Sequence, residues 1–94
     1  MSADKRFSSV WDAIEDTPAE AENMRLRSKL MMALTLQIDR NEWTQSEAAS
    51  HFGVTQPRIS DLMRGKINLF ALDALINMAV AAGLRVDLVV AQAA

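Results

Sequence analysis

Six side chains suited to contact with the edges of DNA bases lie close together in the second half of the chain. They are Gln56, Pro57, Arg58, Ser60, Asp61 and Arg64. Arginine can donate to O6 and N7 of guanine, glutamine can bond N6 and N7 of adenine, and proline can touch a thymine methyl group. Asp61 is the discordant member, since a carboxylate beside phosphate must either accept from cytosine N4 or orient a neighbouring arginine. This combination predicts recognition of double-stranded DNA.

Several of these side chains also have a simpler interpretation. Gln56 is an ordinary polar residue for the first turn of a helix. Arg58 and Asp61 are three residues apart, so an ion pair between them on one helix competes evenly with contact of Arg58 with DNA. Lys66 fits a phosphate or a guanine, as Arg64 does, and His51, the only histidine, is expected at the surface or in the packing of the motif.

Two short capped helices are expected to carry these residues. Thr44 and Glu47 form a capping-box pair, which starts the first helix. Gly53 suits the left-handed conformation that closes it, and Thr55 caps the second helix, which ends at Gly65. Two such helices joined by a short turn containing glycine are the helix-turn-helix motif.

The second of these helices has two different sides. At 100° per residue, Ile59, Leu62 and Met63 fall on one side, which is expected to face the core. Pro57 and Arg64 fall on the opposite side with the other polar residues. The polar side is therefore expected to face DNA.

Composition limits the alternatives. The 94 residues suffice for one domain with a modest core, and the absence of cysteine excludes disulfides and thiolate metal sites. The net charge of −2 is unevenly distributed, because residues 1–23 carry −4 and residues 24–94 carry +2. No apolar run reaches the roughly 20 residues of a membrane-spanning helix, and no signal sequence is evident, so a soluble, cytoplasmic protein is expected. We expect no cofactor and no metal site.

Two further segments precede the motif. Residues 1–17 form an N-terminal arm with helical apolar spacing from Phe7 to Ile14, which either packs against the body or binds another protein. The DNA-binding domain is expected over residues 18–94. It begins with a long helix from Pro18 to about residue 40, in which Arg25, Arg27 and Lys29 form either a solvated basic turn or a phosphate contact.

Another helix and a strand are expected after the motif. The helix starts at Asn68 or nearer Ala71, and Gly83 closes it, with Leu72, Leu75, Ile76 and Ala79 on its buried face. Residues 84–90 then alternate between two faces, which predicts a strand. Because the strand has no obvious partner in the chain, it is expected to pair with a second copy in a homodimer, or else with the N-terminal arm. The dimerising residues are Leu84, Arg85, Val86, Asp87, Leu88 and Val90.

The stretch TQSEAASHFGVTQPRISDLMRGK, residues 44–66, resembles the Xre, or lambda repressor-like, helix-turn-helix family. The matching positions are Thr44, Gln45, Ala48, Ala49, Gly53, Val54, Thr55, Gln56, Ile59, Ser60, Leu62, Arg64 and Gly65. The resemblance extends over about residues 18–90, and within the family it is similar to the antitoxin branch of HigA proteins. Trp43 and Ala71 depart from the family pattern without touching the reading face.

This resemblance implies a mainly α, five-helix DNA-binding domain that binds a palindromic operator as a homodimer. It also implies a partner toxin of the RelE/HigB ribonuclease type, whose operon the antitoxin represses. Base or backbone contact then falls to Gln45, Thr55, Gln56, Pro57, Arg58, Ser60 and Arg64. The expected DNA-binding residues are these seven together with Asp61 and Lys66, which the chemistry of their side chains adds.

Three other functions are weighed against the antitoxin. A stand-alone Xre-type regulator would bind DNA in the same way without a toxin. A protein-interaction adaptor would not need the polar face around Gln56. An enzyme is not expected, since one histidine, no cysteine and no glycine-rich phosphate loop leave little for catalysis.

Overall fold

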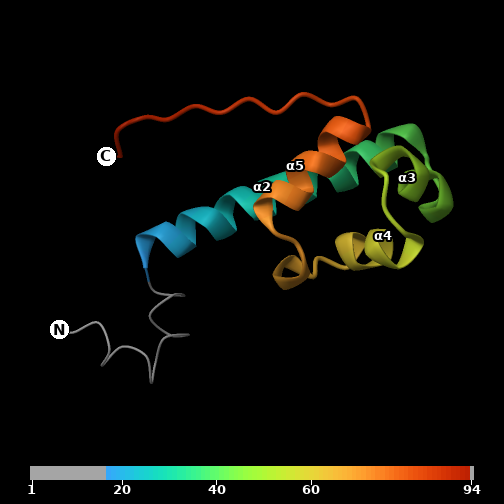
Figure 1. The fold of residues 1–94 in the computed structure, drawn as a ribbon, viewed down its shortest axis with the longest axis horizontal. Helices are drawn as coiled ribbons and strands as arrows, with labels where there is room; N and C mark the ends of the chain where they lie inside the picture. Colours follow the sequence, from blue (N-terminus) through green and yellow to red (C-terminus); the bar gives the residue numbers. More distant parts are fainter. Residues whose placement is uncertain (1–16, 94) are drawn as a thin grey trace, which may run out of the picture.

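A computed structural model describes residues 17–93, which form four α-helices and one 3₁₀ turn. In chain order these elements are α2 (Pro18–Asn41), α3 (Gln45–Phe52), α4 (Gln56–Met63), the 3₁₀ turn η2 (Ile67–Leu69) and α5 (Leu72–Ala81). The shorter elements gather beside the middle and the C-terminal end of the long helix α2, while its first turns extend beyond them (Figure 1). The helix predicted between Phe7 and Ile14 lies outside the described residues.

Both ends of α2 are determined by local chemistry. The Thr17 hydroxyl oxygen accepts a hydrogen bond from the backbone N–H of Glu20 at 3.1 Å, and Pro18 occupies the first turn, as predicted. At the other end Glu42 adopts a left-handed conformation with φ of 55°. The N–H of Trp43 then donates to the carbonyl of Ile38 at 3.1 Å, which completes a Schellman-type end and directs the chain into the motif.

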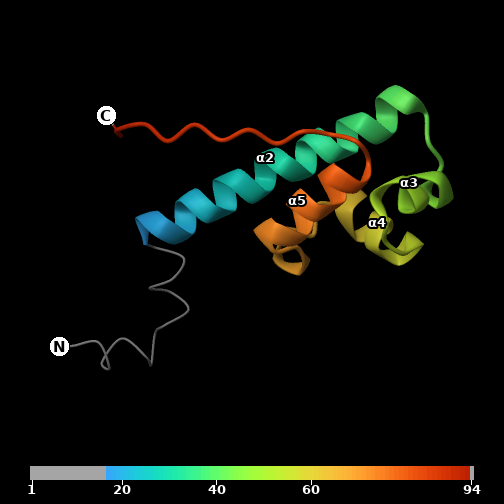
Figure 2. The same ribbon diagram turned by 45° about the horizontal axis from the view of Figure 1, so that its top comes forward.

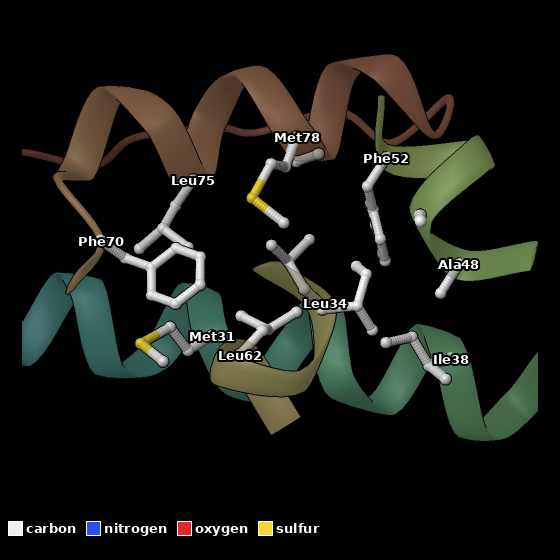
Figure 3. Close-up of a cluster of buried hydrophobic side chains, with 12 residues drawn as sticks. Met31, Leu34, Ile38, Ala48, Phe52, Leu62, Phe70, Leu75 and Met78 are labelled. Atoms are coloured by element: carbon white, nitrogen blue, oxygen red, sulfur yellow. The ribbon is translucent and has the colours of Figure 1, made fainter. Parts of the chain in front are cut away.

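The core is a single cluster to which all four helices contribute (Figure 3). Leu34, Ile59 and Leu75 have no exposed surface, and Phe52 and Phe70 fill the two ends of the cluster. The cluster contains Met31, Leu34, Ile38, Ala48, Ala49, Phe52, Ile59, Leu62, Phe70, Leu75, Met78 and Ala79. Because α3, α4 and α5 all bury side chains against α2, the orientation of α4 is fixed by the core.

Arg27 is buried, contrary to a solvated basic turn. Its side chain lies inside the fold, with only 8% of the residue exposed, and Nη1 donates to the carbonyl of Ile67 at 3.2 Å. Its Nε donates to Asn23 Oδ1 at 2.7 Å, and Nη2 lies 3.7 Å from a carboxylate oxygen of Glu20. Arg27 therefore joins α2 to η2 and is not available to DNA.

The described residues hold four α-helices, so the prediction of five is not supported. Between α4 and α5 the chain forms only the 3₁₀ turn η2. The carbonyls of this segment serve arginine side chains, since Ile67 accepts from Arg27 and Leu69 accepts from Arg58 at 2.7 Å. Helix α5 then begins after Ala71, so the alternative start at Asn68 is wrong.

The buried face of α5 agrees in part with the prediction. Leu75 and Ala79 are buried, whereas Leu72 and Ile76 are half-buried. Met78 also belongs to the core. Gly83 closes the helix at φ of 81°, as predicted, and the N–H of the next residue donates to the carbonyl of Ala79 at 2.9 Å.

Residues 84–93 have no regular secondary structure, so the predicted strand is absent from the described part of the single chain. After α5 this C-terminal segment turns back and runs alongside α2, antiparallel to it, in both views (Figures 1 and 2). Val86 and Leu88 line a groove with Leu30 of α2 and Ile76 of α5. A strand requires a hydrogen-bonded neighbour, and helices α2 and α5 offer no free backbone groups along this path.

Candidate nucleic-acid interface

Helix α3 begins at a complete capping box. The Thr44 N–H donates to Glu47 Oε1 at 2.8 Å, and the Glu47 N–H donates to Thr44 Oγ1 at 3.0 Å. Trp43 stacks on His51 with ring centroids 3.9 Å apart and meets Phe52 edge to face. His51 therefore packs within the motif, one of the two roles expected for it. These contacts hold Gln45 in the exposed first turn of α3.

The turn between α3 and α4 depends on one left-handed residue. Gly53 adopts φ of 70°, and the N–H of Val54 donates to the carbonyl of Ala49 at 3.0 Å. The Thr55 hydroxyl oxygen then accepts from the N–H of Arg58 at 3.3 Å and starts α4. The predicted motif of two capped helices is confirmed.

Helix α4 presents its polar residues on the side away from the core. Ile59 and Leu62 are buried, while Gln56 and Pro57 are exposed in the first turn. The remaining predicted residues of this face are exposed or half-buried, and they are Thr55, Ser60, Asp61, Arg64 and Lys66. Met63 is 42% exposed, so its predicted position in the core is wrong. Although Leu62 in the same turn is buried, Met63 lies at the edge of a groove beside α2.

The Arg58 side chain contacts Leu69 and Phe70 and forms no ion pair with Asp61. Its Nη1 donates to the carbonyl of Leu69 at 2.7 Å, and its guanidinium lies 4.2 Å from the centroid of the Phe70 ring. The proposed ion pair between Arg58 and Asp61 is wrong, because the guanidinium turns toward η2. Arg58 thereby ties α4 to η2 and to Phe70, which follows it. No sequence periodicity signals this contact, since the two partners are 11 and 12 residues away.

Asp61 pairs instead with Lys66, across the turn that ends α4. Lys66 Nζ lies 3.8 Å from Asp61 Oδ1. Among residues 17–93 the Arg64 side chain forms no hydrogen bond or ion pair, and the residue is exposed. The three cations of this surface therefore differ, because Arg58 is tied to the fold, Lys66 is paired and Arg64 is available.

The basic turn of α2 contributes little to this surface. Arg25 is hydrogen-bonded to Glu22, with Nε donating to Oε1 at 3.1 Å. This bond lowers the pKa of Glu22 and raises the pKa of Arg25. Lys29 is exposed beside the groove under the C-terminal segment. Of the three basic residues, Arg25 is paired, Arg27 is buried and Lys29 remains in solvent.

Among residues 17–93, no group of three or more His, Asp or Glu side chains is placed to hold a metal ion. None of the described helices is both long enough and apolar enough to cross a membrane.

Comparison with known proteins agrees with this geometry. A family model described as a helix-turn-helix domain matches residues 13–91. A solved structure described as an XRE-family transcriptional regulator is 30% identical in sequence and superposes with a TM-score of 0.72. That match covers 79% of this chain and 83% of the other. No curated protein matches the chain.

Proposed function

The chain belongs to the helix-turn-helix domain family and is a DNA-binding transcriptional regulator of the Xre type, and we propose that it represses transcription from a palindromic operator. The observation that carries the proposal is the division of α4 into a buried side, with Ile59 and Leu62, and an exposed polar side that begins at Gln56. The exposure of Gln56 and Pro57 in the first turn of α4 supports the proposal, because recognition helices contact base edges in the major groove through their N-terminal residues.

Base readout is tested by replacing Gln56. Duplexes bound by the protein are first selected from random sequence, and the affinity of the preferred site is measured. Gln56→Ala should weaken binding to that site about 5- to 150-fold, the equivalent of about 1 to 3 kcal/mol for a residue that reads a base. Gln92→Ala removes the same side chain from the exposed C-terminal segment and serves as the control. Equal affinity of the Gln56→Ala protein and the unmodified protein would remove Gln56 from the readout.

We further propose that two copies pair through residues 84–90. Leu88 is 73% exposed and Val89 and Val90 are each 87% exposed, which is unusual for consecutive apolar residues. Beyond the N–H of Leu84, this segment forms no backbone hydrogen bond within the described part of the chain. Exposed backbone groups on an apolar extended segment favour pairing with a second copy. In an antiparallel pair centred on Val86, Arg85 of each copy would face Asp87 of the other.

Sedimentation of shortened chains tests the dimer. A chain ending at Gly83 should sediment as a monomer, while a chain ending at Val90 should remain a dimer. A dimer that persists in the shorter chain would exclude this segment as the interface. The intact dimer should require two half-sites about 34 to 36 Å apart on one face of the duplex.

The antitoxin role rests on the resemblance of about residues 18–90 to HigA-like proteins. On this proposal the chain neutralises a small ribonuclease toxin of the RelE/HigB type and represses the operon that encodes both. Purification from the native host tests it by asking whether a small basic protein co-purifies and whether DNA of the chain's own promoter is retained. Retention of promoter DNA without a protein partner would identify a stand-alone regulator. Protein capture without DNA would identify an adaptor. In none of these roles is the chain proposed to be an enzyme.

A further inference from the structure

Asp61 and Lys66 are joined twice at the end of α4. The Lys66 N–H donates to the Asp61 carbonyl at 3.1 Å, and the side chains form the ion pair at 3.8 Å. Gly65, at φ of 72°, makes the turn that brings the two residues together. The backbone bond reduces the conformational freedom that a surface ion pair normally loses when it forms. The carboxylate is therefore held beside Lys66.

This pair lies on the surface that is expected to face DNA. Asp61 belongs to the polar side of α4, and its side chain is 28% exposed. A carboxylate is an unfavourable neighbour for phosphate, and no other acidic side chain lies on α4 itself. Since Arg58 is bonded to Leu69 and Lys66 to Asp61, Arg64 is the cation of this helix end without a partner among residues 17–93.

We infer that Asp61 limits the affinity of the protein for DNA, because it holds Lys66 away from phosphate and so weakens binding to DNA of arbitrary sequence. This inference rests on the proposed DNA-binding function and adds a role for its discordant carboxylate. Binding to arbitrary sequence comes almost entirely from phosphate contacts that release counterions. Removing one such contact lowers the affinity for arbitrary sequences and for the correct site by about the same factor. The protein therefore dissociates more readily from arbitrary DNA, and base contacts such as those proposed for Gln56 must supply a larger share of the affinity at the correct site.

The substitution Asp61→Asn tests the inference without the operator sequence. Asparagine has nearly the same shape, and loss of a negative charge near the C-terminal end of α4 favours the helix, so the variant is expected to fold. Binding to a short duplex of arbitrary sequence is measured by fluorescence anisotropy over a range of salt concentrations. The plot of log affinity against log salt should steepen by about 0.9 for each protomer in contact. At about 0.1 M salt this corresponds to a gain of about eightfold in affinity per protomer.

The control is Glu22→Gln, which removes a carboxylate from a surface ion pair on the far end of α2 and frees Arg25. It makes the same change in net charge as Asp61→Asn but should leave the slope close to that of the unmodified chain. A melting curve followed by circular dichroism checks that each variant is folded.

Substitution of Lys66 in both backgrounds identifies the cation that is released. Lys66→Ala should reduce the slope by about 0.9 in the Asp61→Asn chain and by clearly less in the unmodified chain. An equal reduction in both backgrounds would mean that Lys66 reaches phosphate despite Asp61, and the inference would be wrong. An unchanged slope in Asp61→Asn would also overturn it. If no variant binds any duplex at low salt, the DNA-binding function itself fails, and this inference fails with it.

Discussion

Replacing Arg58 by methionine is expected to destabilise the fold, because the guanidinium bonds to the protein itself. The hydrogen bond to the Leu69 carbonyl has a length of 2.7 Å and a charged donor, and such bonds contribute about 1.5 to 3 kcal/mol. The contact with Phe70 adds about 0.5 to 1 kcal/mol at a partly exposed site. Methionine keeps an apolar stem over the ring. The expected loss in the free energy of unfolding is therefore about 2 kcal/mol.

Thermal unfolding measures this loss. In a domain of this size 1 kcal/mol corresponds to about 4 to 8 °C, so Arg58→Met should lower the Tm by about 8 to 16 °C. Arg64→Met is the matched control, since Arg64 also lies at α4 but has no partner within residues 17–93. It should change the Tm by less than about 4 °C and weaken DNA binding. An unchanged Tm for Arg58→Met together with weaker DNA binding would refute the reasoning and place Arg58 in DNA readout.

Three other substitutions test the remaining local features. Glu42→Gly should raise the free energy of unfolding by about 0.5 to 1 kcal/mol, because glycine adopts φ of 55° without strain. The free energy is measured by urea titration, and a decrease would exclude strain at this position. Gly53→Ala should lower the free energy of unfolding by about 1 to 2 kcal/mol, because alanine is strained at φ of 70°. The added Cβ itself has room, since its nearest neighbour would be Ala81 Cβ at 3.8 Å. Arg27→Met should lower the free energy of unfolding by about 3 kcal/mol, because the Ile67 carbonyl and the Asn23 side chain lose their hydrogen-bond donor. A loss below about 1 kcal/mol would show that water replaces the guanidinium.

The parts of the fold that were predicted correctly are those decided by neighbouring residues. The capping box of Thr44 and Glu47 needs only four residues, and a glycine at Gly53 or Gly83 marks a left-handed helix end wherever it follows an apolar helical pattern. Core residues such as Ile59 and Leu75 follow from the helical period. Together these local signals were sufficient to locate the motif and its polar face.

The roles of the arginines could not be predicted in this way. Arg27 bonds to a carbonyl 40 residues away, and the contact exists only once α2 and η2 have packed. Arg58 had two expected roles, in DNA contact and in an ion pair with Asp61, yet its guanidinium bonds to Leu69. Helical spacing identifies residues that share a face, but it does not determine which of them a distant carbonyl will attract. The pairing of Asp61 with Lys66 was missed for the same reason, because it depends on the turn at Gly65.

The small number of α4 cations that remain available to DNA is an argument for the proposed dimer. With Arg58 bonded within the fold and Lys66 beside Asp61, helix α4 and the turn after it offer DNA little more than Arg64 and the neutral side chains around Gln56. One such surface supplies few phosphate contacts and should bind weakly at physiological salt. In the proposed dimer, two surfaces joined by residues 84–90 would bind in succession, and the second binding event would be intramolecular and therefore favoured by a high effective concentration. A chain ending at Gly83 should consequently bind the whole operator only about as tightly as the intact chain binds a duplex that carries a single half-site.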